Sequence, residues 1–113
     1  MSVEACWTVR FGDPRSPSVE MNGGIVVLES GRIFGGDSGF AYLGTYSVTD
    51  AVVEGSFEAI QHDAQVGSIY GDGVARFRAN FTVSGDERMK SGEIKRDGYP
   101  SARLVLKRFA ELP

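Results

Sequence analysis

GRIFGGDSGFAYLGTY, which runs from Gly31 to Tyr46, is the stretch of sequence that decides the fold. Bulky residues alternate with small or polar ones on both sides of a glycine-rich break, and a period of two is typical of β-strands whose two faces differ. Within the break, Gly35, Gly36 and Gly39 tolerate positive φ, so we expect a tight reversal or a bulge there. The stretch predicts antiparallel β-structure and contains no motif that identifies a reaction.

The same alternation recurs along the rest of the chain, whereas helical spacing of apolar residues never persists for more than one turn. Turn-forming Gly, Asp, Ser and Pro residues separate the segments, and Ser30-Gly31 is a two-residue hairpin signal. The predicted strands are Ala5–Phe11, Ile25–Glu29, Arg32–Phe34, Phe40–Val48, Val52–Ile60, Val74–Val83, Met89–Arg96 and Ala102–Phe109.

One stretch, Gln61–Gly73, breaks the pattern with glycines among polar residues, and we predict a long connection there with one helical turn or a short extra strand. A meander of about eight strands closes most naturally into a barrel, because closure removes the exposed edges. We therefore predict an all-β, antiparallel, up-and-down eight-stranded β-barrel. A barrel of this size has an interior that side chains fill or that holds one small ligand.

Length and composition limit the number of domains and the cellular compartment that we expect. A chain of 113 residues can build one hydrophobic core, so we predict a single domain over residues 1–113. No apolar run is long enough to cross a membrane, and the N-terminal residues lack the basic and then apolar pattern of a secretory signal. Cys6 is the single cysteine, which rules out a disulfide within the chain. These features predict a cytoplasmic protein without a membrane partner.

Charge is distributed unevenly along the chain. Residues 1–56 hold three arginines against seven carboxylates, and residues 57–113 hold nine basic residues against eight carboxylates. The acidic first half would repel nucleic acid, so we expect no nucleic-acid partner. Basic residues on the late strands are expected on the solvated face of the sheet. They are Arg76, Arg78, Lys95, Arg103 and Lys107.

A catalytic interpretation of Gly36-Asp37-Ser38-Gly39 fails on two counts, although this tetrapeptide also surrounds the nucleophile of trypsin-like serine proteases. The single histidine, His62, follows Ser38, whereas that family places its histidine first, and the chain is too short for a double barrel. We expect instead a turn in which the Asp and Ser side chains bond to the backbone.

Neither His62 nor Cys6 indicates a catalytic or metal-binding site. His62 and Asp63 would point to opposite faces of a strand, and one His and one Cys far apart give no metal-ligand spacing. We expect His62 at the surface near a strand end and Cys6 as an inert thiol. The sequence thus predicts no enzyme, with no catalytic residues, no metal and no cofactor.

Aromatic residues form the remaining constellation of interest. Their strand positions place most of them on faces that can point inward, where they either pack the core or line an apolar pocket with Tyr and Trp polar groups. Both interpretations hold together if the barrel is incompletely filled. Phe11 belongs to the same set, and the candidate cavity residues are Trp7, Phe40, Tyr42, Tyr46, Phe57, Phe77, Phe81 and Leu104.

The inward face cannot be assigned from the sequence at Val26 and Val27, or at Val52 and Val53, because both neighbours are apolar. Strands that carry apolar residues on both faces are candidates for a subunit interface, since a dimer needs apolar area outside the barrel.

The run GRIFGGDSGFAYLGTY, preceded by NGGIVVLES and followed by SVTDAVVEGSFEAIQHD, resembles the GrlR-like family. The resemblance covers roughly Trp7 to Asp63 and, more weakly, the final ARLVLKRFAEL. The best-known member of that family is a negative regulator of type III secretion gene expression. The resemblance implies a lipocalin-like eight-stranded barrel with an apolar interior that forms a homodimer.

The family's regulator binds a transcriptional activator through a Glu-Asp-Glu-Asp motif in the turn after the aromatic strand. The matching stretch here is Ser47-Val48-Thr49-Asp50, in which Asp50 alone keeps a carboxylate. An activator-binding surface built on clustered negative charge is therefore expected to be absent or different. We predict a regulatory or protein-interaction barrel with Asp50 as the loop candidate for partner binding. The alternative is a carrier or sensor of a small apolar ligand held in the barrel.

Overall fold

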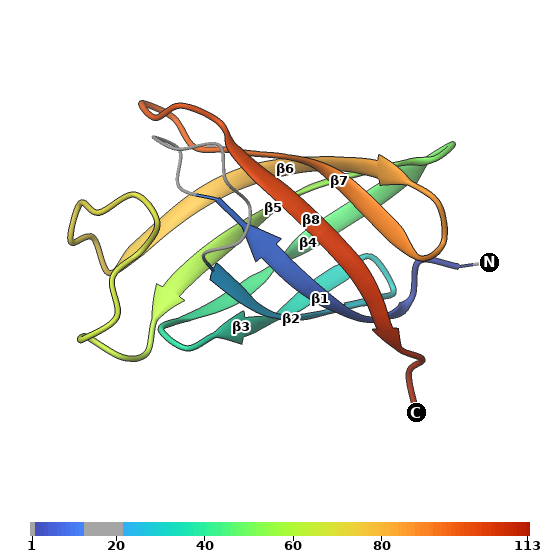
Figure 1. Ribbon diagram of the computed structural model, residues 1–113, viewed down its shortest axis with the longest axis horizontal. Coiled ribbons are helices and arrows are strands. Elements are labelled where there is room, and N and C mark those ends of the chain that lie inside the picture. Colours follow the sequence, from blue (N-terminus) through green and yellow to red (C-terminus); the bar gives the residue numbers. More distant parts are fainter. Residues whose placement is uncertain (1, 13–21) are drawn as a thin grey trace.

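The computed structural model describes residues 2–12 and 22–113, and these form an all-β structure without a helix. Eight antiparallel strands close into a barrel in which each strand pairs with the next and the last pairs with the first (Figure 1). The strands are β1 (Ala5–Phe11), β2 (Asn22–Glu29), β3 (Arg32–Asp37), β4 (Phe40–Thr49), β5 (Val52–Gln61), β6 (Arg76–Gly85), β7 (Met89–Lys95) and β8 (Ala102–Ala110).

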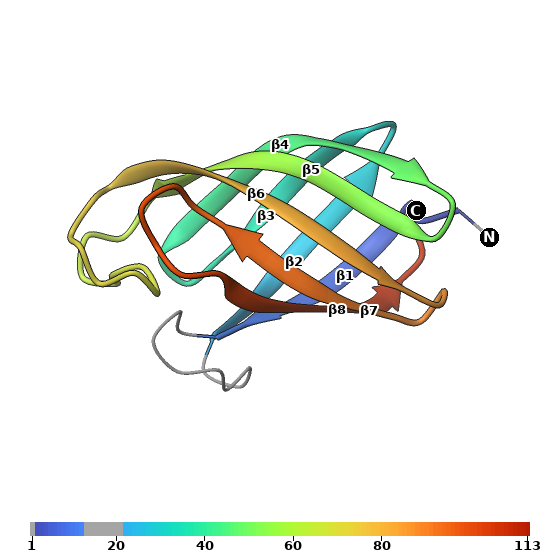
Figure 2. The ribbon, with the colours of Figure 1, turned by 90° about the horizontal axis from the view of Figure 1, so that it is seen from above.

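The two ends of the barrel differ in what covers them. One end carries both termini and the short turns β2–β3, β4–β5 and β6–β7, and we call it the closed end. The opposite end carries residues 62–75, which connect β5 to β6 and extend beyond the strands (Figures 1 and 2), and we call it the open end. The described residues include no helix that is long and apolar enough to span a membrane.

The predicted up-and-down barrel is confirmed, and its strands lie where the alternation places them. β1 has the predicted bounds, and the other strands differ from the prediction by at most three residues at either end. The predicted long connection between β5 and β6 is confirmed as residues 62–75, but these residues form turns and bends and contain no helix or extra strand.

The predicted tight reversal in the glycine-rich break is confirmed at Gly39 but not at Gly35 and Gly36. Both residues lie inside β3, and the chain reverses later, at Ser38 and Gly39. Gly35 is needed for a different reason: a Cβ atom at that position would collide with the backbone oxygen of Ile25 on β2. Glycine therefore lets two strands approach closely here.

Two hairpin turns at the closed end depend on positive φ. Ser30 has φ 52° and Gly31 has φ 78°, which is the pair of values that a two-residue type I′ turn requires. The predicted hairpin at Ser30-Gly31 is thus confirmed. Asp50 has φ 57° in the turn between β4 and β5, and Asp is one of the few residues other than Gly that tolerate this conformation.

Side chains of alternate residues fill the barrel, and the ambiguous positions are resolved. Val26 and Val53 point inward and are buried, while Val27 is half-buried and Val52 is exposed. The five basic residues of the late strands are exposed, as the prediction of a solvated face requires. Leu104 and Leu106 of β8 alternate inward with the same period of two.

Candidate ligand-binding cavity

The closed end of the barrel is tightly packed. Trp7, Leu28, Val53 and Val83 are the largest side chains that are fully buried. The Trp7 indole donates from Nε1 to the carbonyl oxygen of Val3 at 2.9 Å, so its polar atom is paired despite burial. The alternation of residues along β1 predicts that Trp7 lines the cavity, but in the structure Trp7 packs into the closed end.

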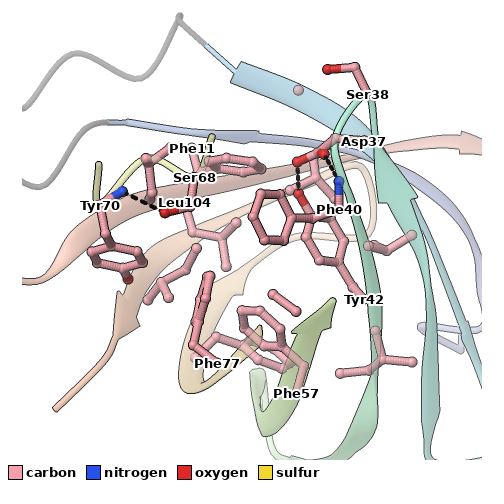
Figure 3. A pocket seen from close by; sticks show the side chains of 18 of the residues that line it. Phe11, Asp37, Ser38, Phe40, Tyr42, Phe57, Ser68, Tyr70, Phe77 and Leu104 are labelled. Carbon is pink, nitrogen blue, oxygen red and sulfur yellow. Dashed lines mark hydrogen bonds between the residues drawn. The ribbon is translucent and has the colours of Figure 1, made fainter. Parts of the chain in front are cut away.

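The open half of the barrel is hollow. A cavity of about 200 Å³ lies between the strands, bounded by residues of all eight strands and by the segment between β5 and β6. Aromatic and aliphatic side chains make up most of its wall, and Figure 3 shows the rings of Phe40, Phe57 and Phe77 among them. The wall is therefore largely apolar.

The aromatic rings stay on the wall because they stack on one another edge to face or tilted. The centroids of Tyr42 and Phe57 are 5.8 Å apart, and those of Phe57 and Phe81 are 6.3 Å apart. Phe81 lies over Gly55 of the neighbouring strand, where a Cβ atom would come within 2.9 Å of the Phe81 ring. Glycine on β5 thus gives the ring room against the backbone, and the centre of the barrel stays open.

One charged group reaches this cavity from the described residues, the carboxylate of Asp37 at the end of β3. Its Oδ1 accepts hydrogen bonds from the backbone nitrogens of Gly39 at 2.8 Å and Phe40 at 2.7 Å. Its Oδ2 accepts a hydrogen bond from the Tyr42 hydroxyl (Figure 3). Burial, together with this hydrogen bond and the charge of Asp37, raises the pKa of Tyr42 far above its ordinary value, so the phenol stays protonated.

Residues 62–75 cover the mouth of the cavity, and we call them the lid. Val66, Ile69 and Tyr70 of the lid line the cavity, and Tyr70 is buried. The Tyr70 ring packs edge to face on Phe77, with centroids 5.4 Å apart. The lid is therefore an apolar cap that rests on the rim of the barrel.

Asp72 of the lid contacts Arg96 and Tyr99 in the connection between β7 and β8, and we call these three residues the latch. The guanidinium of Arg96 lies 4.3 Å from the centroid of Phe77 and 4.8 Å from that of Tyr70. Arg96 Nη2 also lies 2.9 Å from Asp72 Oδ2, and these side chains are only 12% and 16% exposed. The Tyr99 hydroxyl donates to the same carboxylate at 2.7 Å. That hydrogen bond is the main reason why the pKa of Asp72 lies below its ordinary value.

The latch is not fully satisfied within the part of the chain that the structure describes. Tyr70 Oη and Arg96 Nη1 are both buried, and neither has a hydrogen-bond partner there. A buried polar group without a partner lowers the stability of the state that buries it. The closed lid is thus held less strongly than its stacked rings suggest.

The cavity gathers most of the residues that the sequence singled out. Phe40, Tyr42, Phe57, Phe77, Phe81 and Leu104 line it, and so does Phe11. Trp7 and Tyr46 do not, because both lie toward the closed end, and Tyr46 is half-exposed beside Gly31.

Sequence reasoning missed Asp37 and the lid residue Tyr70. The sequence pattern marks Asp37 only as a turn residue, and Tyr70 lies in an irregular segment without periodicity. The one available signal was an aromatic residue isolated among glycines, in Tyr70-Gly71-Asp72-Gly73.

The catalytic interpretation of the GDSG stretch finds no support in the geometry. Asp37 bonds to the backbone of the turn as predicted, but the predicted bond from the Ser38 side chain is absent among the described residues, and Ser38 is exposed. His62 is exposed just after β5, as predicted, and its Nε2 lies 3.0 Å from the backbone oxygen of Asp37, not from Ser38. Cys6 is a free, half-buried thiol.

Residues 47–50 are all exposed at the closed end. Asp50 stands at the tip of the turn, where its positive φ gives it a conformational role as well. The proposed role of Asp50 in partner binding remains a prediction.

No family model matches the chain, and comparison with curated proteins finds no relative. The cavity is therefore the main indication of function.

Proposed function

We propose that the protein binds one small, largely apolar molecule inside the barrel, without chemical conversion. The observation that carries the proposal is the cavity of about 200 Å³ in an otherwise well-packed interior. Protein interiors normally contain few voids larger than a water molecule, so a void of this size calls for an explanation. Apolar burial of a ligand supplies the driving force.

The volume limits the size of the ligand. An apolar cavity of about 150 Å³ is known to hold benzene, so a cavity of about 200 Å³ suits roughly eight to ten non-hydrogen atoms. Access runs past the lid, whose aromatic cap and polar latch lie over the mouth. Lid opening on a microsecond to millisecond timescale is the usual way in which such segments admit a ligand.

n-Propylbenzene, a probe of nine non-hydrogen atoms, tests the proposal by titration followed by NMR. We expect saturable shifts confined to residues that line the cavity. Ala59 of β5 is buried and lines the cavity, so Ala59→Leu should fill part of it and weaken binding at least tenfold. Ala41→Leu, on the outward face of β4 at the same end, is the matched control and should leave binding unchanged. Equal binding by both variants, or no binding by the native protein, contradicts the proposal.

A second candidate function, as a regulatory or protein-interaction module, is favoured by the outer face of β2, β3 and β4. Val27 pairs with Phe34, and Phe34 pairs with Leu43, so their side chains form one row across three strands. Phe34 is 40% exposed and Leu43 is 50% exposed, and Ile25 adds an exposed side chain in the next row. A contiguous apolar patch of this kind marks an association surface.

We propose that a second copy of the chain occupies this patch. An isologous dimer places the same surface on both partners, and an uncharged patch meets its own copy without repulsion. Sedimentation velocity tests this proposal with Leu43→Ser, which should shift a dimer toward monomer. Phe109→Ser, at an exposed apolar residue on β8, is the control. A native protein that stays monomeric at high concentration contradicts the dimer but leaves the ligand proposal untouched.

A further inference from the structure

We infer that the cavity selects ligands whose polar head donates hydrogen bonds, above all protonated amines, and discriminates against carboxylates. The inference rests on the proposed function, since it names the chemical class of the molecule that the cavity would hold. It is carried by the polar groups that Asp37 and Tyr42 present to the cavity.

The hydrogen bonds that Asp37 already makes determine how many acceptor positions of its carboxylate remain free for a ligand. A carboxylate has about four acceptor positions, two on each oxygen. Oδ1 uses both for the backbone nitrogens of Gly39 and Phe40, and Oδ2 uses one for the Tyr42 hydroxyl. Oδ2 therefore keeps one acceptor position, which only a donor can fill.

Tyr42, like Asp37, offers a ligand only hydrogen-bond acceptors. Its hydroxyl hydrogen is committed to Asp37, so its oxygen offers lone pairs and no donor to any further group. The carboxylate and the phenol thus form one acceptor site at the rim of an apolar cavity. Two backbone nitrogens hold the carboxylate in place, so it loses little freedom when a ligand binds.

Charge strengthens the preference. Among the described residues, Asp37 is the one charged side chain that lines the cavity, and it makes no ion pair with any of them. Arg96 lies behind Tyr70 and Phe77, outside the lining, and is already paired with Asp72. A ligand carboxylate would meet like charge in an apolar setting, whereas an ammonium group would make a charge-assisted hydrogen bond.

Hydroxyl groups at the mouth do not reverse this preference. Ser38 and Ser68 line the cavity, but a serine hydroxyl can donate as well as accept. Tyr70 also lines the cavity, and its neutral phenol could give an anion at most one hydrogen bond. Such a bond would leave the repulsion from Asp37 in place.

Three probes of matched size, each with a phenyl ring and a short side chain, test the inference: 2-phenylethylamine, phenylacetate and n-propylbenzene. Each is titrated into the native protein at pH 7, where the free amine is protonated and the free acid is ionised. We expect the amine to bind at least tenfold more tightly than the acid. Equal affinities, or tighter binding of the acid, would overturn the inference.

Two variants separate the carboxylate charge from its surroundings. In Asp37→Asn the amide oxygen can still accept from Gly39 and Phe40, so the turn is preserved while the charge is lost. This variant should bind the amine at least tenfold more weakly and n-propylbenzene within twofold of the native protein. Tyr42→Phe frees a second position on Oδ2 and should keep the preference for the amine.

The outcomes distinguish the two proposals. A preference for the amine that survives Asp37→Asn, or that disappears in Tyr42→Phe, overturns the role given to Asp37 here while the binding cavity stands. Failure of all three probes, n-propylbenzene included, overturns the proposed function itself.

Discussion

The two ends of the barrel are built by the same eight strands, yet one is solid and the other hollow. At the closed end, Trp7, Val53 and Val83 are fully buried and none of them lines the cavity, whereas the fully buried Leu28 borders it. At the open end the side chains are larger, but the aromatic rings stack along the wall and leave the centre empty. Whether the interior of a small barrel is filled therefore depends less on side-chain size than on whether the aromatic rings pack along the wall or in the centre.

The largest expected effect is at the closed end, where truncation of Trp7 removes the most completely packed ring. Trp7→Ala should lower the free energy of unfolding by about 3–5 kcal/mol, the usual cost of aromatic truncation in a core. Phe77→Ala at the open end removes a half-buried ring beside existing empty space and should cost clearly less. Urea unfolding followed by far-UV circular dichroism measures both. Equal losses would show that the two ends are packed alike.

Enlarging a side chain sharpens the same comparison. Ala5 at the closed end is fully buried, and Ala5→Leu should overpack it at a cost of about 1–3 kcal/mol. Ala59→Leu can extend into the cavity, so its unfolding free energy should stay within about 1 kcal/mol of the native value. The same urea experiment gives both numbers. A loss from Ala59→Leu as large as that from Ala5→Leu would mean that the cavity cannot accept a side chain.

The lid latch predicts a smaller and more local effect. Asp72→Ala removes the partner of Arg96 and Tyr99, and hydrogen bonds to charged groups contribute about 1.5–3 kcal/mol. Hydrogen exchange of the lid amides should accelerate by at least tenfold, while exchange in β1 and β2 stays unchanged. Uniform acceleration through the barrel would show that the lid does not open independently.

The pKa of Asp72 gives the latch a pH dependence of known sign. Because this pKa is lowered in the folded protein, the ionised carboxylate stabilises the closed lid above about pH 4, and the stabilisation is lost as the pH falls further. Lid exchange, corrected for the intrinsic pH dependence of exchange, should therefore rise below about pH 4 in the native protein. In Asp72→Ala this rise should be absent.

The smallest expected effect concerns the turn at Asp50. Asp50→Asn removes the charge but keeps a residue that tolerates positive φ, so stability should change by less than about 0.5 kcal/mol. Asp50→Ala should cost about 1 kcal/mol, because alanine is strained in this conformation. Thermal unfolding compares the two variants. A loss in Asp50→Asn equal to that in Asp50→Ala would assign the role of Asp50 to its charge and not to its backbone.

The barrel could be predicted from sequence because its determinants are local. The alternation of Trp7, Val9 and Phe11 sets the inward face of β1, and Ser30-Gly31 sets the register of the β2–β3 hairpin. Gly35 and Gly36 misled the prediction because glycine permits two things, a reversal and a close approach of strands. The distinction depends on Ile25 of the neighbouring strand, which a local pattern does not include.

The cavity could be predicted only in part. Periodicity identified the inward rings, but their volume alone does not say whether they meet in the centre of the barrel. The latch joins Asp72 to Arg96 and Tyr99, residues that lie on two separate connections and meet only because β6 and β7 pair. No periodic signal marks such a contact, so it became visible only in three dimensions.

The closure of the barrel between β1 and β8 has a consequence for how the chain folds. Seven of the eight pairings join consecutive strands and can form as local hairpins, but the eighth brings together residues as distant as Cys6 and Ala110. Non-local pairing of this kind slows folding, so closure is expected to be the late step. Until it occurs, β1 and β8 are both unpaired edges on which another unfinished chain can add a strand. The yield of refolding should therefore fall as the protein concentration rises, although the finished barrel has no open edge.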